Sequence, residues 1–496
     1  MSTLIPRGPS NAARGQGRGQ GRGQGRGQGR GQGRGRGRGD GGRGSSSGSW
    51  RGRGNNGREQ GPNSGRSRDQ PAKSTVVEAP LGRLITKITL GSVSSDNTQA
   101  GDAKISNCQY AASYSLVDSK SPKIIIPGEP ATWTPPSLPS QLPGDRGDYL
   151  RDHNGARFPE HPMLPSVYSL LSLNKDLDMS DVDIMACASS LGDLLRFVRS
   201  VDLTFRFDVE MVGDTLFLVR NCRDQVIPDV RGYGHSFLDT FTSYGPNVKE
   251  TKSHQRIVSY SFGGLRCLVR FECDGYLTSN GGDFTATATK LDDLGLSKSP
   301  IVEAAGAIVP QKSIIEIKTR SKARSQVGVP LDIEEQLPRL WLRQIPNFIT
   351  AYHSMGNFED VQEKAIQQEL LEWEEKHQSD LRKFASILRQ LIVEAKRAGH
   401  LKLELCRIDS GPLELREQAG KPREVLPSDW RDMWARQRPG PGSDGGVGLS
   451  DEDGDDSYPS LLSRKGESGE SDESDDDFSL DFTACDPSCG YCGKCA

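Results

Sequence analysis

Two short segments of this chain combine the apolar content of a buried strand with charges that a buried strand rarely carries. They span residues 269–276 and residues 314–320. Side chains alternate between the two faces of a strand. In the first segment Arg270, Glu272 and Asp274 therefore share one face, opposite an apolar face. So regular a charged face indicates either a functional site or a strand that faces solvent.

The second segment repeats this pattern. Glu316 and Lys318 share one face, and Ile315 and Ile317 share the other. If the two strands are neighbours, three carboxylates and one lysine converge on a single patch. The alternative is that both segments are edge strands whose charges face solvent, because one polar face is common in such strands.

A patch of this kind predicts a metal site. Three carboxylates at close range repel one another and lose hydration, and a divalent cation relieves both problems. The carboxylates of Glu272, Asp274 and Glu316 are hard oxygen ligands, which suit magnesium or manganese. The metal lowers the pKa of a bound water, and Lys318 beside it can orient that water. The pattern is typical of phosphodiester hydrolysis.

These motifs resemble those of a known family. An acid-x-Asp motif followed by Glu-x-Lys is similar to the PD-(D/E)XK nuclease superfamily, and within it to the DXO-type decapping exoribonucleases. The motifs here are residues 272–274 and 316–318. Residues 234–239, 259–268 and 341–348 resemble further family features in the same order. The resemblance implies an α/β fold, with a mixed central sheet of the PD-(D/E)XK type flanked by helices.

The resemblance also implies roles for individual residues. Glu272, Asp274 and Glu316 would hold magnesium or manganese, with Asp239 as a further ligand. Glu316 and Lys318 would be the catalytic residues. The activity implied is removal of an incomplete cap from RNA, followed by digestion from the 5′ end.

The chain departs from the family pattern at two positions. Leu238 stands where the family has glutamate, and Asp239 follows it. Arg343 stands where the family has glutamine, and Gln344 follows it. The alternative interpretation is therefore a nuclease fold with a degenerate site that binds RNA or another partner. The chain is also similar to a fungal group in which some members are labelled geranylgeranyl diphosphate synthase. Prenyl synthesis is disfavoured, because it needs two Asp-rich motifs on facing helices and the central region here is typical of strands.

Composition divides the 496 residues into four parts. The hydrophobic fraction is 34%, which is low for a chain that is folded throughout. We expect a disordered Arg/Gly-rich arm over residues 1–76, a nuclease-like α/β domain over 77–436, a disordered acidic tail over 437–481, and a four-cysteine cluster over 482–496.

The Arg/Gly-rich arm repeats arginine and glycine with nothing apolar to bury. Flexible arginine-rich segments bind single-stranded nucleic acid through phosphate contacts and stacking, so RNA is the expected partner. A solubilising or self-associating tail is the alternative. Lys322 and Arg324 form a basic edge beside the acidic patch and suit the same polyanion. The arginines expected to bind nucleic acid in the arm are Arg14, Arg18, Arg22, Arg26, Arg30, Arg34, Arg36 and Arg38.

The C-terminal region carries two further signals. The acidic tail predicts a protein partner or competition with RNA for the basic arm. The last residues place four thiols close together, at Cys485, Cys489, Cys492 and Cys495. This spacing predicts a metal site, with zinc favoured over an iron–sulfur cluster, and redox-active thiols or disulfides as the alternative.

Within residues 77–436, hydrophobic periodicity predicts the secondary structure. Helices are expected at 180–199 with Ser180 as N-cap, near 333–343, and as one long helix at 358–399. Strands are expected at 81–88, 124–126, 347–352 and finally 401–406, with hairpins at 204–220 and 258–268. No apolar run approaches the ~20 residues that span a bilayer, and the N-terminus lacks a signal peptide's apolar region. We therefore expect an intracellular protein, nuclear or cytoplasmic, that is not secreted.

Overall fold

The fold was examined in a computed structural model of the chain. The structure describes residues 80–92, 103–119, 121–174, 177–201, 204–221, 225–278, 296–322 and 333–436. The chain divides into the units Met1–Arg68 and Asp69–Ala496, and every described residue belongs to the second. The predicted Arg/Gly-rich arm, acidic tail and cysteine cluster lie outside the described residues.

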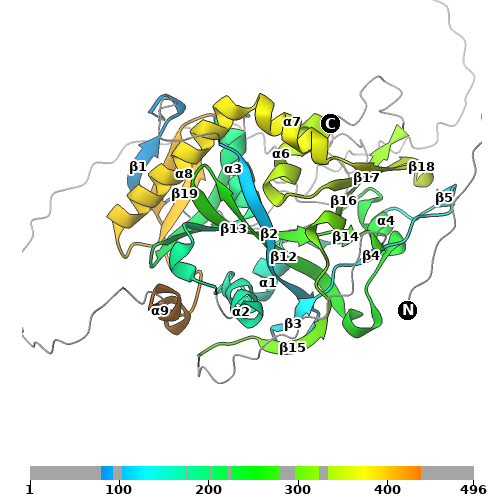
Figure 1. Ribbon diagram of the computed structural model, residues 1–496, viewed down its shortest axis with the longest axis horizontal. Coiled ribbons are helices and arrows are strands. Elements are labelled where there is room, and N and C mark those ends of the chain that lie inside the picture. Colours follow the sequence, from blue (N-terminus) through cyan, green and yellow to red (C-terminus); the bar gives the residue numbers. More distant parts are fainter. Residues whose placement is uncertain are drawn as a thin grey trace, which may run out of the picture. The chain divides into compact units, whose positions relative to one another are not determined.

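The described strands form two large mixed sheets and a two-stranded ribbon (Figure 1). In spatial order, the larger sheet contains β1 (Leu84–Ile88), β20 (Leu413–Glu417), β19 (Leu403–Arg407), β8 (Phe205–Val212), β9 (Thr215–Arg220), β7 (Ile184–Cys187), β13 (Leu265–Cys273), β12 (Thr251–Phe262), β2 (Ile105–Val117), β3 (Lys123–Gly128) and β15 (Ile301–Gly306). The smaller sheet contains β11 (Thr242–Ser243), β4 (Thr132–Trp133), β14 (Gly275–Tyr276), β16 (Ile314–Ser321), β17 (Asn347–Ser354), β18 (Asn357–Ala365) and β5 (Ser140–Gln141). The ribbon pairs β6 (Tyr149–Leu150) with β10 (Val226–Ile227).

Helices pack on both sheets. The α-helices with described bounds are α1 (His153–Arg157), α2 (Leu164–Leu173), α3 (Ala188–Val198), α4 (Gly234–Phe241), α6 (Ile333–Arg343), α7 (Gln367–Lys376), α8 (Gln378–Ala398) and α9 (Ser428–Arg436). Short 3-10 helices cover Leu90–Ser92, Met179–Asp181, Pro246–Val248 and Gln311–Ser313. The predicted α/β class is confirmed, with the strands shared between two mixed sheets. No helix in these ranges is long and apolar enough to cross a membrane.

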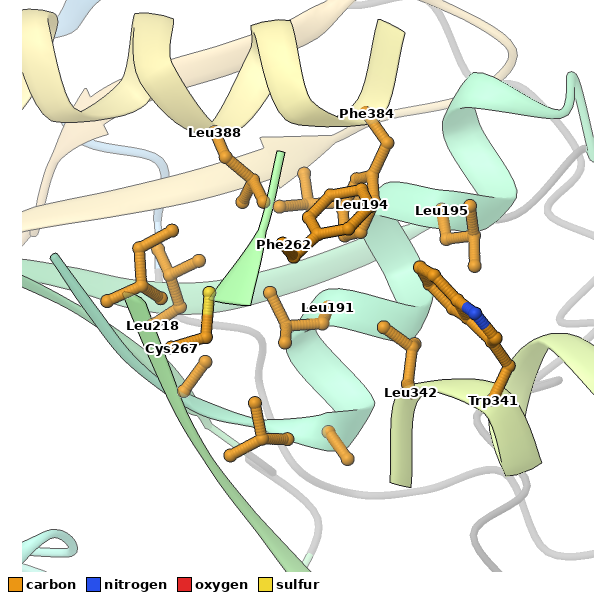
Figure 2. Packing of buried hydrophobic residues seen from close by; sticks show 14 of the residues in the cluster. Leu191, Leu194, Leu195, Leu218, Phe262, Cys267, Trp341, Leu342, Phe384 and Leu388 are labelled. Atoms are coloured by element: carbon orange, nitrogen blue, oxygen red, sulfur yellow. The ribbon is translucent and has the colours of Figure 1, made fainter. Parts of the chain in front are cut away.

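Apolar side chains fill both faces of the larger sheet. On one face, α3, α6, α7 and α8 cover the sheet, and the ring of Phe262 lies 5.3 Å from that of Phe384 and 5.4 Å from that of Trp341 (Figure 2). On the other face, α2 and α9 enclose a second cluster around Tyr168 and Trp430. In the smaller sheet, apolar residues of β16 pack with Phe237 of α4. The apolar face of β16 is thus covered, which leaves its charged face toward α6.

The two predicted hairpins form as expected. β8 and β9 pair across the Gly213–Asp214 turn, and β12 and β13 pair across Gly263 and Gly264. Both of these glycines have positive φ, 54° and 79°, which a two-residue turn with the right twist requires. Strands near 81–88, 124–126 and 347–352 and a helix at 333–343 are also confirmed.

The helix predicted for residues 180–199 is only half present. Residues Met179–Asp181 form a 3-10 turn capped by Asp178 instead of Ser180, β7 follows, and α3 begins at Ala188. All of β7 is buried and pairs in parallel with β13 and β9. A short apolar run fits a buried strand as well as a helix, and here pairing on both sides determines the outcome. Asp193 of α3 pairs with Arg196.

The single helix predicted for residues 358–399 is also wrong. Its first part is β18, which forms a hairpin with β17, and the rest is two helices that meet at His377. The His377 ring stacks on Trp373 and its Nδ1 lies 2.8 Å from the Trp373 carbonyl oxygen. Gly399 ends α8 as predicted, with φ at 64°. The strand predicted to be last, at 401–406, is followed by β20 and α9.

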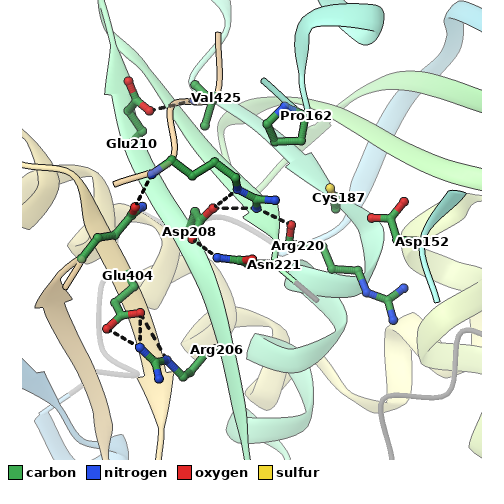
Figure 3. A network of polar contacts seen from close by, with 12 residues as sticks. Asp152, Pro162, Cys187, Arg206, Asp208, Glu210, Arg220, Asn221, Glu404 and Val425 are labelled. Carbon is green, nitrogen blue, oxygen red and sulfur yellow. Dashed lines mark hydrogen bonds and ion pairs between the residues drawn. The ribbon is translucent and has the colours of Figure 1, made fainter. Parts of the chain in front are cut away.

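Asp208 and Glu210 prove to be structural. β8 lies between β19 and β9, and both carboxylates are buried. Asp208 accepts hydrogen bonds from Arg423 Nε at 2.6 Å and from Asn221 Nδ2 at 2.8 Å (Figure 3). Glu210 accepts one from Lys402 Nζ at 2.6 Å. Each carboxylate is thus paired within the fold.

Buried histidines make the stability of the fold sensitive to acid. Burial, followed by the charge of Arg256, lowers the pKa of His254 well below its usual value. Below about pH 6.5 the unfolded chain takes up a proton that folded His254 does not, so the free energy of unfolding falls by up to about 1.4 kcal/mol per pH unit. We expect His254→Gln to flatten this dependence in urea unfolding at pH 7, 6 and 5. The exposed His400→Gln serves as the control, and an equal slope in wild type and His254→Gln would contradict the assignment.

Candidate functional site

The two charged segments meet where the chain passes from the larger sheet to the smaller one. β13 ends at Cys273, Asp274 follows, and β14 then pairs antiparallel with β16, with Gly275 opposite Ile315. β13 itself is not a partner of β16, so the expected adjacency arises through β14. Asp274 Oδ2 accepts a hydrogen bond from the Ile317 backbone N–H at 2.8 Å. Asp274, Glu316 and Lys318 are thereby brought together, as the sequence predicted.

Glu316 lies at the centre of this group. Lys318 Nζ lies 3.0 Å from Glu316 Oε1, and Arg339 also pairs with that oxygen. Arg343 Nη1 donates to Glu316 Oε2 at 3.2 Å. Arg339 and Arg343 come from α6, which faces the charged side of β16. Both oxygens of Glu316 are therefore paired with cations of the chain.

The surroundings of Asp274 are acidic as well as basic. Burial raises the pKa of Asp274, and the charge of Lys318 opposes this rise. Burial raises the pKa of Tyr244 too, with further increases from the negative charges of Glu272, Asp274 and Asp239. All three carboxylates are therefore close enough to Tyr244 to influence its pKa. The pKa of Asp239, on α4, is raised by burial and by the charge of Asp145.

The predicted metal ligands do not form a ready metal site. Among the described residues, no three His, Cys, Asp or Glu side chains lie close enough together to hold a metal ion. Glu316 is occupied by Lys318 and two arginines, whereas Glu272 faces an adjacent hollow. In this arrangement the donor set does not fit a divalent cation, because the central carboxylate is already neutralised.

A small hollow lies next to this group. Four arginines line it, Arg151, Arg220, Arg270 and Arg343, and we call it the arginine hollow. Asp152 and Glu272 are its acidic side chains. Figure 3 shows the Arg220 side chain extending from the end of β9 toward Asp152. Four guanidinium groups against two carboxylates make the arginine hollow electropositive.

The N-terminus of α3 also opens on the arginine hollow. Cys187, Ala188 and Ser189 line it, and no side chain caps the helix at Cys187. A helix N-terminus presents backbone N–H groups and a partial positive charge, which favour anions. Arg270 is 5% exposed, donates to Gln255 Oε1 at 3.1 Å and lies 3.0 Å from Cys187 Sγ. Its buried Nε has no hydrogen-bond partner.

One residue of a stacked aromatic pair, Tyr149, lies two positions before Arg151 of the arginine hollow. The rings of Tyr149 and His235 stack with centroids 3.7 Å apart and planes 13° apart. Burial lowers the pKa of His235 to about 4, so the imidazole is neutral at pH 7, and Lys318 is close enough to contribute to this shift. Tyr149 precedes Arg151 by two residues, and Arg151 N–H continues the strand pairing to the Gln225 carbonyl. Arg151 thus directly follows the strand that carries Tyr149.

Among the residues predicted to bind nucleic acid, the structure describes Lys322 alone. Lys322 pairs with Glu359 of β18 at 2.7 Å. Arg324 and the arginines of the arm lie outside the described residues, as do the four C-terminal cysteines. Sequence reasoning missed Arg151, Arg220 and Arg339. Arg270 is the one of these arginines that the sequence marks, because it shares a strand face with Glu272.

Comparison with known proteins places the chain in a family. Residues 84–403 match a family described as a domain of unknown function, DUF8563. The match covers more than half of the chain. The chain belongs to this family. No curated protein matches the chain.

Solved structures similar to this DUF8563 member include fungal Rai1 and Dxo1 proteins, as the motifs predicted. The S. pombe Rai1 structure has 13% identity and a TM-score of 0.43, covering 67% of this chain and 99% of that one. Scheffersomyces stipitis Rai1 in complex with (3′-NADP)+ and calcium ion has 12% identity and a TM-score of 0.46, covering 73% and 100%. K. lactis Dxo1 in complex with manganese has 11% identity and a TM-score of 0.37, covering 70% and 98%.

Proposed function

We propose that this protein binds the phosphorylated end of an RNA strand, with the terminal phosphate in the arginine hollow. The observation that carries the proposal is the convergence of four arginines and the α3 N-terminus on one small hollow. Guanidinium groups donate paired hydrogen bonds to phosphate oxygens, and a helix N-terminus adds backbone donors. A small hollow suits a terminal phosphate better than the backbone of a strand that passes through.

The aromatic pair supports a nucleotide as the bearer of this phosphate. Residues two apart on a strand are separated by about 7 Å. Tyr149 lies in β6 and Arg151 follows the strand directly, so a phosphate at Arg151 leaves the attached base within reach of Tyr149. Stacking on a tyrosine ring is tolerant of base identity. The predicted arginine-rich arm, which suits single-stranded RNA, makes RNA the favoured strand, and the resemblance to 5′-end nucleases makes the 5′ end the favoured end.

Metal-dependent cleavage of RNA is the second candidate, as decapping or digestion from the 5′ end. Asp274, Glu316 and Lys318 favour it, because the fold brings together the residues that the sequence motifs predict. Glu272, Asp274 and Glu316 would be the ligands of magnesium or manganese, with Asp239 as a further one. Arg339 and Arg343 would first have to leave Glu316, so binding without cleavage is the better-supported function.

One assay separates the two candidates. The full chain is titrated with fluorescent RNA that carries a 5′-phosphate, a 5′-hydroxyl or a 3′-phosphate, and the products are run on a gel after incubation with magnesium or manganese. We expect the 5′-phosphate to improve affinity by at least about tenfold, since a single charge-assisted hydrogen bond contributes about 1.5–3 kcal/mol. The contribution of the arm is shared by all three RNAs and cancels.

The outcomes are distinct. Equal affinity for all three RNAs would contradict the terminal-phosphate site. A preference for the 3′-phosphate would contradict the assignment of the 5′ end and show that the arginine hollow binds the 3′ end instead. RNA that becomes shorter with wild type, but not with Glu316→Ala, Lys318→Ala, would establish cleavage. Tyr149→Ala tests the base separately, because it removes stacking worth about 1–3 kcal/mol, whereas Tyr149→Phe keeps the ring.

A further inference from the structure

We infer that Arg339 and Arg343 of α6 take the place of a divalent cation at Glu316, so that the resting site excludes metal. This inference concerns the charged group around Glu316, which adjoins the arginine hollow through Arg343, and it does not depend on RNA. It starts from the two oxygens of one carboxylate. Lys318 Nζ lies 3.0 Å from Oε1, where Arg339 also pairs, and Arg343 Nη1 lies 3.2 Å from Oε2.

Burial makes these pairs difficult to exchange for a metal. The side chains of Glu316, Arg343 and Lys318 are 2%, 3% and 7% exposed. Removing one partner from a buried ion pair leaves an uncompensated charge, which is strongly unfavourable. A metal that takes the oxygens of Glu316 would leave the buried Arg343 without this carboxylate partner.

The local charge balance points the same way. Asp274 and Glu316 contribute two negative charges, and Lys318, Arg339 and Arg343 contribute three positive ones. These five side chains around Glu316, without Glu272 and Asp239, therefore have a formal charge of +1, and a divalent cation would raise it to +3. A metal site needs the opposite balance, with an excess of carboxylates that the ion relieves.

α6 is fixed in the position that delivers its arginines. The indole Nε1 of Trp341 donates to Glu374 Oε2 at 2.7 Å, and the Tyr260 hydroxyl donates to the Leu342 carbonyl at 3.1 Å. Gln311 Nε2 donates to the carbonyl oxygens of Arg343 and Gln344 at 3.1 and 2.8 Å. These contacts from Glu374, Tyr260 and Gln311 hold the end of the helix, and so position the backbone from which both arginines reach Glu316.

The test measures Mn²⁺ binding to the full chain by calorimetry and by the electron paramagnetic resonance signal of free Mn²⁺, without RNA. Four proteins are compared: wild type, Glu316→Gln, Arg339→Gln with Arg343→Gln, and this double variant with Glu316→Gln added. The acidic tail and the cysteine cluster can also take metal. Only binding that depends on Glu316 is therefore counted, as the difference between each protein and its Glu316→Gln counterpart.

In wild type we expect no Glu316-dependent Mn²⁺ site. In the arginine double variant we expect one, with an affinity for Mn²⁺ at least about tenfold above that of wild type, because two like charges have been removed. Glu316-dependent binding in wild type would overturn the inference, whether or not the double variant folds. A folded double variant that gains no such site would overturn it as well. Binding of 5′-phosphorylated RNA by the same proteins is scored separately, so failure of the metal inference is distinguishable from failure of the proposed function.

Discussion

The Arg151→Gln, Arg220→Gln double variant is expected to bind 5′-phosphorylated RNA about 100-fold more weakly than wild type. Both guanidinium groups line the arginine hollow from partly exposed positions, Arg151 after β6 and Arg220 at the end of β9. Each charge-assisted hydrogen bond to phosphate contributes at least about 1.5 kcal/mol, and about 1.4 kcal/mol corresponds to a tenfold change in affinity. Fluorescence anisotropy with 5′-phosphate and 5′-hydroxyl RNA measures the change.

The comparison between the two RNAs identifies the site. Affinity for 5′-hydroxyl RNA should change little, because that RNA has no terminal phosphate to place in the arginine hollow. The matched control removes two exposed charges elsewhere, with Arg397→Gln and Lys376→Gln, whose side chains are 72% and 63% exposed. A loss of equal size for both RNAs would show that Arg151 and Arg220 contact the RNA backbone in general, and would contradict a terminal-phosphate site.

Trp341→Ala is expected to lower the free energy of unfolding by about 3–5 kcal/mol, which is the usual cost of removing a buried aromatic side chain. Trp341 is 1% exposed, and its ring packs against those of Phe262 and Trp373. Its indole N–H donates to Glu374 Oε2, which also accepts from the Ile105 backbone N–H at 2.9 Å. The substitution therefore leaves a cavity and removes one donor from a buried carboxylate.

Urea unfolding of three variants tests this assignment. Trp341→Phe keeps a six-membered aromatic ring but loses the pyrrole part of the indole with its hydrogen bond, so a smaller loss of about 1–3 kcal/mol is expected. Leu371→Ala, at a side chain that is 53% exposed, should change stability by no more than about 0.5 kcal/mol. If Trp341→Ala costs no more than Leu371→Ala, Trp341 does not anchor α6, and the account of how the arginines are held at Glu316 fails with it.

The sequence by itself determined the local elements whose signals are short in range. The hairpin through Gly263 and Gly264 follows from two glycines with positive φ between alternating runs, and Gly399 ends α8 for a related reason. The alternation of β16 placed Glu316 and Lys318 on one face in advance of any structure. These features depend on residues adjacent along the chain, because backbone dihedral angles and the alternation of side chains along a strand are set locally.

The tertiary structure decided everything that depends on pairing between distant segments. Residues 184–187 became β7 because β13 and β9 lie on either side, and the start of the helix predicted at residue 358 became β18 because β17 pairs with it. The nature of the site was decided in the same way. Sequence motifs predicted carboxylates for a metal, but two long side chains from α6, Arg339 and Arg343, reach Glu316 and pair with it instead.

The arginine hollow illustrates the limit most clearly. Its four guanidinium groups come from positions between residue 151 and residue 343, with no common spacing or periodicity. Charge attracts over several ångströms in space, whereas a sequence pattern records only separation along the chain. The strands could thus be predicted from alternation, while the electropositive character of the site required the packing of β6, β9, α3 and α6 around β13 to bring the charges together.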